Sequence, residues 1–512
     1  MEDVLYSIIH SGGLDGIRSY QADVEVDVGK GLPGFYMVGK LSGEVREAKE
    51  RVKVSMKNSG ISLPPVQITV NISPASISKN GTAFDLPIAV GILNSLDMIP
   101  PTHLEDTCII GELSLDGTVR QINGVLPIVL AARDAGMRSC IVPSGNRSEA
   151  SFVDGIDIYP VNTLLEAIDL LTGDEFIPSE PEASVMAKVL ATEDNLLFED
   201  IVGQEACKRA ALIAASGFHH LLIIGPPGTG KTMIAKRIPY IMPPLTTDES
   251  LEVSSIYSVA GLLSEEKPII TMRPFRSPHH TATMQTLAGG GRYVRPGIIS
   301  LAHRGVLFMD EFPEFSRECI EVLREPLEEK SIHIARVNST STFPADFMLV
   351  AAANPCPCGY FPNRNKCNCT LPQITHYRSR MSGPTKDRID ITVTAEKTDP
   401  DRLIDTKSVG TNSMYTTKAM RDTVLRVRSV QSNRFIGTNI KYNSEIPPSL
   451  INRYCKLGKK ESEFIKDAMN SMEFSARAYH KILKVARTIA DIDECDTISI
   501  DHLSEAICYR GA

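Results

Sequence analysis

Short apolar runs alternate with longer stretches of helical spacing over the first third of the chain. Strand-like runs cover residues 24–28, 67–71, 108–112 and 139–142. Apolar positions recur at helical spacing over 43–58, 85–96 and 124–135. This alternation predicts an α/β domain over residues 1–175, whose strands need not all be parallel.

A second group of apolar runs follows an acidic, proline-bearing stretch. Residues 176–195 lack hydrophobic periodicity, and we interpret them as a linker. Apolar strands are then predicted at 221–224, 305–311 and 347–355, within a domain of residues 196–395.

Beyond about residue 396 the pattern is helical. Apolar positions recur at this spacing over 422–433, 461–472 and 476–491. Ser475 is placed to cap the last of these stretches. Residues 396–512 are therefore predicted to form a helical domain.

The stretch LLIIGPPGTGKT, residues 221–232, joins a predicted strand to a predicted helix through a glycine-rich turn. Such a turn directs its backbone N–H groups toward a polyphosphate, and the helix N-terminus adds partial positive charge. A lysine at position 231 neutralises the β- and γ-phosphates, and a threonine at 232 offers a hydroxyl to Mg²⁺. The predicted phosphate-binding residues are Gly225, Pro226, Pro227, Gly228, Thr229, Gly230, Lys231 and Thr232.

Polar residues also end the next two predicted strands. Asp310 and Glu311 follow an apolar run, in the order expected for a Mg²⁺-holding carboxylate and a carboxylate that polarises the attacking water. Asn354 ends the following run, where an amide can orient that water and contact the γ-phosphate. These three residues are predicted to complete a nucleotide-hydrolysing site.

Arg388 lies between acidic neighbours near the end of this domain. A planar guanidinium at this place is suited to reach the nucleotide of a neighbouring subunit. The alternative is a surface ion pair with Asp387 or Asp390.

Residues 271–304 form a basic insert with five arginines, three histidines and no acidic residue. Glycines 289–291 predict a flexible tip, and interleaved aromatics suit a nucleic-acid backbone. A predicted hairpin at 331–343 adds a second candidate surface. The predicted nucleic-acid contacts are Arg273, Arg276, Arg292, Arg295 and Arg336. The alternative is that these arginines face ATP or a subunit interface.

Residues 356–369 read CPCGYFPNRNKCNC and contain two Cys-x-Cys pairs separated by eight residues. Cys356, Cys358, Cys367 and Cys369 can close a tetrahedral thiolate site around a structural Zn²⁺, which leaves no open position for catalysis. The alternative is a set of free thiols in a solvent-exposed loop.

Composition narrows the class of function. A chain of 512 residues is expected to form about three domains. The net charge of −8 argues against a protein that coats nucleic acid, so any nucleic-acid site must be a local patch. Because no run of about 18 apolar residues and no signal-peptide pattern appears, we expect a cytoplasmic protein without a membrane partner.

Motifs over nearly the whole chain resemble those of the AAA+ ATPases, within them the magnesium-chelatase and MCM-like branch, and most closely the YifB/ComM family. The motifs read VGQE, GPPGTGKT, RPFRSPHHT, GVLFMDE, LREPLEE, NPCPCGY, SGPTKDRIDI and SARAYHKILKVARTIAD. The resemblance implies an AAA+ P-loop core with a parallel sheet, a C-terminal helical lid, and ATP and Mg²⁺ as cofactors. It assigns Lys231 and Thr232 to Walker A, Asp310 and Glu311 to Walker B, and Asn354 to sensor 1.

The resemblance also assigns two arginines. Arg388 would be a finger acting in trans, which implies a homo-hexameric ring because each site is then completed by the next subunit. Arg477, in the first turn of a predicted lid helix, would be sensor 2 and could be aimed at the γ-phosphate. A departure is Asp346, where related sequences usually carry arginine.

The family implies DNA as a partner and branch migration as the activity, extending heteroduplex during homologous recombination of incoming DNA. Two alternatives belong to other classes. One is a chaperone-like or chelatase-type ATPase that remodels a protein, and the other is a regulatory ATPase whose N-terminal domain binds a protein partner.

That N-terminal third resembles the proteolytic domain of Lon. The resemblance is carried by GLPGFYMVG, EAKERVKVSMKNSG, ITVNISPASISKNGTAFDLPIAVGIL and GELSLDGTVRQINGVLP. A Ser–Lys dyad requires a hydroxyl nucleophile and an amine base. The matching positions hold Ala83 and Leu126, so we expect a binding or assembly domain and not a protease.

Overall fold

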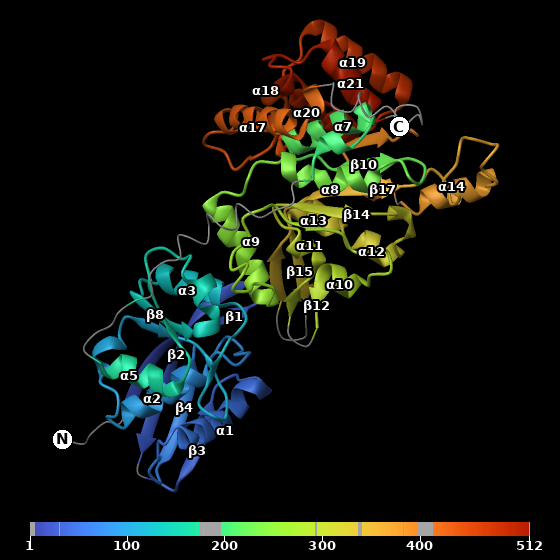
Figure 1. The fold of residues 1–512 in the computed structure, drawn as a ribbon. Coiled ribbons are helices and arrows are strands. Elements are labelled where there is room, and N and C mark those ends of the chain that lie inside the picture. The colour runs from blue at the N-terminus through green and yellow to red at the C-terminus, as the bar shows by residue number, and fades with distance from the viewer. Residues whose placement is uncertain are drawn as a thin grey trace.

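The computed structural model describes residues 6–29, 31–173, 178, 196–291, 294–335, 340–381, 383–397 and 413–510. An N-terminal α/β region, blue to teal in Figure 1, lies beside a larger region that runs from green to red. Residues 174–177 and 179–195, most of the predicted linker, are outside the described residues.

The N-terminal region contains a mixed four-stranded sheet in the order β1-β2-β4-β3. Its strands are β1 (Tyr6–Asp15), β2 (Arg18–Gly29), β3 (Gly34–Val38) and β4 (Gln67–Ser73). The pairs β1–β2 and β2–β4 are antiparallel, and β3 is parallel to β4. Alternate residues of β2 and β4, Val24, Val26, Ile68 and Val70 among them, are buried. This is the pattern of a sheet with one face on the core.

Helices α1 (Gly43–Asn58) and α2 (Asp85–Ser95) supply the buried face that this sheet packs against. A parallel sheet, β5-β8-β9, forms a second layer. The remaining elements are β5 (Thr107–Ile109), β6 (Glu112–Leu113), β7 (Val119–Arg120), α3 (Val125–Asp134), β8 (Ser139–Pro143), α4 (Arg147–Ala150), β9 (Asp157–Val161) and α5 (Leu164–Thr172). The predicted α/β architecture with mixed strand directions is confirmed.

The central sheet of the larger region has five parallel strands in the order β11-β14-β17-β10-β18. They are β10 (Leu221–Ile224), β11 (Phe275–Arg276), β14 (Val306–Met309), β17 (Met348–Ala353) and β18 (Ile391–Thr394). Every residue of β14 and β17 is buried. Strands that are covered on both faces have continuous apolar sequences. These apolar runs are the signal that predicted the strands from the sequence.

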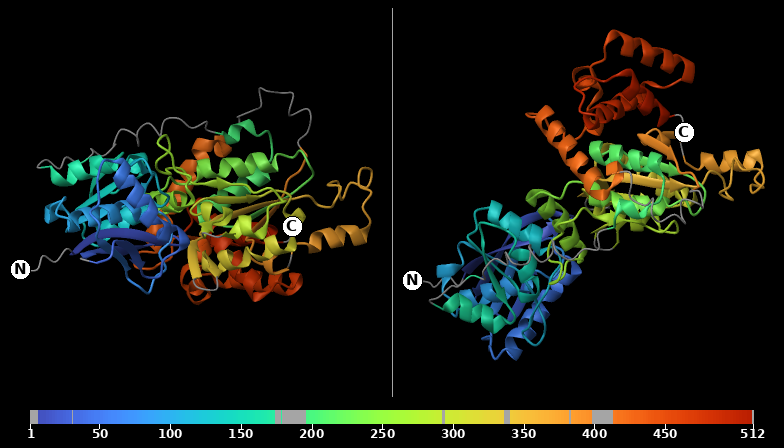
Figure 2. Two further views of the ribbon diagram at one scale, coloured as in Figure 1. Left: turned by 90° about the horizontal axis from the view of Figure 1, so that it is seen from below. Right: turned by 45° about the horizontal axis from the view of Figure 1, so that its top comes forward.

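Helices α7 (Glu205–Gly217) and α8 (Lys231–Ile241) pack against each other and beside β10. The other elements are α9 (Thr247–Ala260), α10 (Met284–Ala288), β12 (Gly289–Gly290), β13 (Arg295–Pro296), α11 (Ile298–Leu301), α12 (Arg317–Glu321), α13 (Arg324–Glu329), β15 (Ser331–Ala335), β16 (Thr340–Pro344), α14 (Leu371–Ser379) and α15 (Gly383–Lys386). Strands β15 and β16 form the predicted antiparallel hairpin. In Figures 1 and 2, α14 extends outward from the sheet.

The C-terminal region is helical, as predicted. It contains α17 (Thr417–Arg434), α18 (Ile451–Tyr454), α19 (Lys459–Met472), α20 (Ala476–Ile492) and α21 (Ile500–Cys508). Ser475 caps α20 by accepting a hydrogen bond from the Ala478 backbone at 3.2 Å.

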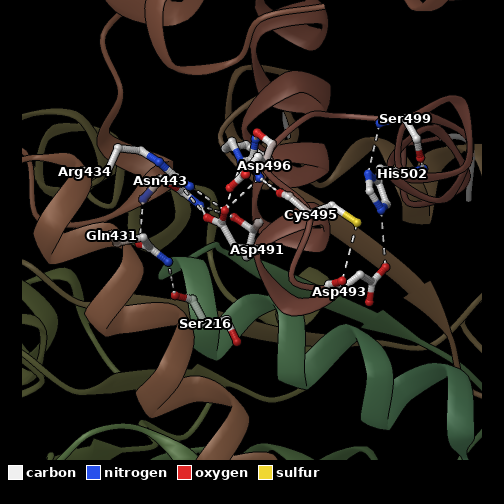
Figure 3. Close-up of polar contacts among 12 residues, drawn as sticks. Ser216, Gln431, Arg434, Asn443, Asp491, Asp493, Cys495, Asp496, Ser499 and His502 are labelled. Atoms are coloured by element: carbon white, nitrogen blue, oxygen red, sulfur yellow. Dashed lines mark hydrogen bonds and ion pairs between the residues drawn. The ribbon is translucent and has the colours of Figure 1, made fainter.

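A buried polar network fixes these helices to the core (Figure 3). Asp491 accepts hydrogen bonds from Arg434, at 2.5 and 2.6 Å, and from Arg487, at 3.0 Å. Gln431 donates to the Ser216 carbonyl of α7 at 2.8 Å. Because breaking a buried ion pair leaves an uncompensated charge, this network holds α17 and α20 in one position on α7.

The two regions touch through α3 and α9. The Ser258 hydroxyl of α9 donates to the Glu149 carboxylate at 2.5 Å, and the Ser258 carbonyl accepts from Gly124 N–H at 3.0 Å. Burial raises the pKa of Glu149. Among the described residues, no helix combines the length and apolar character needed to cross a bilayer.

Candidate nucleotide site

The glycine-rich loop lies between the end of β10 and the start of α8. Gly228 and Gly230 have φ of +78° and +82°, a region that favours glycine. No protein atom lies within 4 Å of a Cβ placed on either residue, so this part of the loop borders open space. The backbone therefore forms a cradle that fits a phosphate group.

The Lys231 ammonium closes this cradle. It donates to the carbonyl oxygens of Gly225 at 2.7 Å and Pro226 at 2.9 Å, and to Asn354 Oδ1 at 3.3 Å. Burial lowers the pKa of Lys231, and the nearby Asp310 carboxylate opposes this effect. The lysine and the amide predicted to contact the γ-phosphate thus meet at one point.

The predicted Mg²⁺ ligands also meet. The Thr232 hydroxyl donates to Asp310 Oδ2 at 2.8 Å. A hydroxyl and a carboxylate in this arrangement fit a hard cation that keeps several waters and bridges phosphate oxygens. Thr232 and Asp310 are therefore the residues that would hold Mg²⁺ beside a bound nucleotide.

Glu311 follows Asp310 in a left-handed conformation, with φ of +50°. Its backbone N–H donates to Asp310 Oδ1 at 2.9 Å, and its exposed carboxylate lies 3.4 Å from His280 Nδ1. Sequence reasoning did not single out His280, although it belongs to the RPFRSPHHT motif. The contact brings the basic insert to the predicted water-polarising carboxylate.

All these residues lie at the carboxyl ends of parallel strands, where ligands bind in open α/β sheets. Gly225 follows β10, Asp310 follows β14 and Asn354 follows β17. Gly225, Pro226 and Asn354 border a cavity of about 630 Å³ that extends along β18. Their meeting was predicted from the sequence, whereas their catalytic roles stay predictions.

Arg388 and Arg477 lie together at the opposite, amino edge of the sheet. They border a cavity of about 670 Å³ with His220 and Asp346, which precede β10 and β17. Four residues of β10 separate this edge from the P-loop, about 13 Å along the strand. Arg477 therefore lies away from the P-loop of its own chain, and its role as sensor 2 stays a prediction. Arg477 belongs to α20, and this helix packs against α7.

The ion-pair alternative for Arg388 named the wrong carboxylates. Arg388 pairs with Glu328 of α13, a residue 60 positions away. Asp390 is instead held by Lys481 of α20 at 2.7 Å and by the His220 backbone at 3.0 Å. Sequence neighbours were poor candidates because the pairing partners come from other elements.

The basic insert is less accessible than its sequence suggested. Arg273 is buried and donates to the Pro243 carbonyl at 2.5 Å, the Arg304 carbonyl at 2.7 Å and Glu249 at 3.1 Å. Arg273 is therefore a structural residue, and its prediction as a nucleic-acid contact is corrected. Its charge is neutralised by α9, which the pattern along the insert did not show.

Arg276 lies over the Tyr257 ring at 4.9 Å and donates to its hydroxyl at 3.0 Å, so it is half-buried. Arg295 is exposed on β13. Arg292 and Arg336 lie outside the described residues. Of the predicted contacts within the structure, Arg295 is the one most open to a ligand.

Asp346, which the resemblance marked as a departure, is also structural. It is buried and pairs with Arg304 at 2.6 Å and Lys330 at 3.4 Å. Arg304 further pairs with Glu252 of α9 at 3.1 Å. Asp346 therefore compensates two cations beside the amino-edge cavity.

The four predicted zinc ligands form a cluster whose sulfur atoms all lie within 4.8 Å of one another. Cys356 Sγ lies 3.4 Å from Cys358 Sγ and 3.8 Å from Cys367 Sγ. Tetrahedral Zn–S bonds of about 2.3 Å place sulfurs about 3.8 Å apart. A hydrogen bond from the Tyr360 backbone lowers the pKa of Cys358, whereas burial raises the pKa of Cys367. The donor set fits Zn²⁺.

The position of a Lon-type dyad is apolar. Leu126 is fully buried, and Ala83 packs against the same hydrophobic cluster. Neither side chain offers a nucleophile or a base.

A glycine-rich cradle between a parallel strand and a helix, facing a threonine–aspartate pair, defines a P-loop nucleotide-binding protein. "Magnesium chelatase, subunit ChlI" matches residues 197–403, "Subunit ChlI of Mg-chelatase" matches 24–146, and "Magnesium chelatase, subunit ChlI C-terminal" matches 414–510. Competence protein ComM of Haemophilus influenzae is 41% identical over 509 residues, 99% of this chain and 97% of that protein. The chain belongs to the magnesium-chelatase family of AAA+ proteins that includes ComM and YifB.

Two further relatives differ in how much of this chain they match. Uncharacterized protein YifB of Escherichia coli is 38% identical over 505 residues, 99% of this chain and 97% of that protein. Lon protease 2 of Bacillus subtilis is 31% identical over 122 residues, 23% of this chain and 21% of that protein. The Lon-like similarity is thus partial.

Proposed function

We propose that this protein hydrolyses ATP at interfaces between identical subunits and uses the energy to remodel DNA. The proposal rests on the separation of two groups of predicted site residues, which lie at opposite edges of the central sheet. The phosphate-binding residues lie at its carboxyl edge, and Arg388 and Arg477 lie at its amino edge. A closed ring of six subunits, the arrangement that the family resemblance implies, brings the amino edge of one copy to the carboxyl edge of the next.

In this mechanism Lys231 binds the β- and γ-phosphates, and Thr232 and Asp310 would hold Mg²⁺. Bound Mg²⁺ neutralises charge on the phosphate oxygens. Glu311 polarises the attacking water, and Asn354 orients it. Each of these contacts positions or stabilises, which is most of what phosphoryl transfer requires of a protein.

The arginines of the adjacent subunit complete the site. Arg388 and Arg477 would stabilise the charge that develops on the γ-phosphate, and such an arginine contributes about 10³- to 10⁵-fold to the rate. Because Arg388 pairs with Glu328 in the single chain, assembly would exchange this partner for phosphate. Hydrolysis would then require assembly.

DNA is the proposed substrate of the motor. The β15–β16 hairpin and exposed Arg295 on β13 offer a protruding surface for a phosphate backbone. One relative carries "competence" in its name, and the family resemblance implies branch migration during recombination. We therefore propose that the ring moves branched DNA.

A protein substrate is the second candidate. Arg273 and Arg304 are neutralised by α9, which leaves less free positive charge than the insert suggested. A motor that acts on protein would not need this charge. The Lon-like region would then serve as the partner-binding domain.

The test measures ATP hydrolysis at low salt with no DNA, with single-stranded DNA and with a branched junction. We expect stimulation by the junction, and a weaker response in Arg295→Ala. The matched control is Arg138→Ala, an exposed arginine of the N-terminal region whose loss should change nothing. Intact basal hydrolysis with neither binding nor stimulation would favour the protein substrate.

We also propose that the four cysteines hold a structural Zn²⁺. The spacing of their sulfur atoms supports this proposal. We expect about one zinc per purified chain and none after all four are changed to serine. Equal zinc in both proteins would overturn it.

A further inference from the structure

The four-cysteine loop is built onto the strand end that carries Asn354. Cys356 follows Asn354 by two residues and is fully buried. At the other end, Thr370 follows Cys369 directly and caps α14 with both hydrogen bonds of a capping box. The sulfur cluster therefore joins the end of β17 to the start of α14.

Helix α14 also contacts the Asn354–Pro355 turn, where the four-cysteine loop begins. Arg378 donates from Nε to the Pro355 carbonyl at 3.3 Å. The Tyr377 side chain is buried, which raises its pKa to about 12, and the nearby Asn354 backbone opposes this rise. Two adjacent residues of one helix thus hold the Asn354–Pro355 turn.

The same helix is packed on the metal ligands. Ile374 is buried against Cys356 and Cys367, one turn before the residues that hold the turn. Figures 1 and 2 show α14 extending away from the sheet, so this small cluster must supply much of its support. A cluster of this size has little apolar surface to stabilise it without a metal.

The loop also contacts the phosphate cradle. Gly359 has φ of +82°, and a Cβ there would lie 2.7 Å from Cδ of Pro227 and 3.8 Å from Cγ of Asn354. Asn354 in turn accepts from Lys231 at 3.3 Å. The cysteine loop, the amide and the P-loop are therefore in contact.

We infer that Zn²⁺ held by the four cysteines positions Asn354 and the P-loop, so that ATP hydrolysis depends on zinc although zinc takes no part in the chemistry. The inference deepens the proposed function and rests on it for its effect on rate. Four thiolates leave zinc no open position, so its action passes through the protein. A catalytic group displaced by about 1 Å can lower a rate by about 100-fold. Tyr377 is the positioning residue of this connection.

The first test uses Cys358→Ser and Cys369→Ser, the two less buried ligands, with the exposed Cys495→Ser as matched control. We expect zinc to be lost from the two ligand variants and retained in the control. Hydrogen exchange of backbone amides in residues 225–232 and 354–355 should become faster in the ligand variants. Unchanged exchange in β14 of the same central sheet would report that the core remains folded.

The second test leaves the cysteines intact. Tyr377→Phe should retain its zinc, keep its affinity for a fluorescent ATP analogue and lose about tenfold in kcat, because its phenol no longer interacts with the Asn354 backbone. Tyr454→Phe, a tyrosine of the lid region, is the control and should behave as wild type.

These measurements separate the two proposals. Faster exchange confined to residues 356–369 after zinc loss, or wild-type kcat in Tyr377→Phe, would overturn the inference. A wild-type protein that binds ATP but never hydrolyses it would refute the proposed function instead. In that case the exchange measurement still decides whether zinc supports the P-loop.

Discussion

The carboxyl and amino edges of the central sheet, one strand length apart, display different chemistry. The carboxyl edge brings together a phosphate cradle, Lys231, and the Thr232–Asp310 pair. The amino edge displays arginines around a cavity and has no such cradle among the described residues. The phosphate cradle lies at one edge and Arg388 and Arg477 lie at the other, as expected when the complete site forms between two copies.

The Lon-like region extends the contrast. Its fold persists around a site where Ala83 and Leu126 now contribute to an apolar cluster. In the AAA+ core the corresponding polar residues are all present and converge. The position of function in this chain therefore follows the side chains and not the fold alone.

The largest expected effect comes from removing the carboxyl-edge lysine. Lys231→Ala should abolish binding of a fluorescent ATP analogue, because its ammonium is the P-loop cation placed to neutralise the β- and γ-phosphates. Equilibrium titration measures the affinity for this analogue. Wild-type affinity in a folded variant would contradict the assignment of this edge.

Glu311→Gln separates binding from chemistry. The substitution keeps size and hydrogen bonding but removes the charge that polarises water, so nucleotide affinity should persist while kcat falls about 10²- to 10⁴-fold. Single-turnover hydrolysis gives the rate. If binding and rate fell together, Glu311 would instead be part of the binding site.

Arg388→Ala tests the amino edge. We expect normal nucleotide affinity with a loss of about 10³-fold in kcat, because a finger acts on the transition state. Arg421→Ala, an exposed arginine of α17, is the control and should retain full activity. Lost affinity in Arg388→Ala would mean that the residue serves its own nucleotide.

Asp346→Asn should have the smallest effect on hydrolysis. It leaves Arg304 and Lys330 without their shared carboxylate beside the amino-edge cavity. Breaking a buried pair of this kind costs about 3 kcal/mol of folding free energy. Urea unfolding measures this loss, and kcat per folded chain should change little. A large kcat effect with unchanged stability would assign Asp346 a role in the site.

Much of this arrangement was predictable from local pattern. The P-loop, the strand ends at Asp310 and Asn354, and the cap at Ser475 each depend on residues adjacent in sequence. What could not be predicted depends on pairing over long separations. Helix α9, whose serine-rich sequence has weak periodicity, was missed, and its carboxylates neutralise Arg273 and Arg304.

The position of Arg477 in the helical C-terminal region also depends on contacts over long sequence separations. Its helix and N-cap were predictable, but the side of the sheet on which that helix packs was not. That side is decided by contacts with the core such as Thr488 of α20 with His219 at 2.8 Å, residues 269 positions apart. A motif can therefore identify a functional residue without showing which nucleotide it serves.

Mixing two inactive variants tests the central claim most directly. Lys231→Ala subunits keep both arginines, and Arg388→Ala subunits keep an intact phosphate cradle. If each site forms between copies, an equal mixture should recover activity at about a quarter of its interfaces, because one subunit in two supplies each half. A mixture as inactive as its components, under conditions where rings assemble, would show that each chain completes its own site.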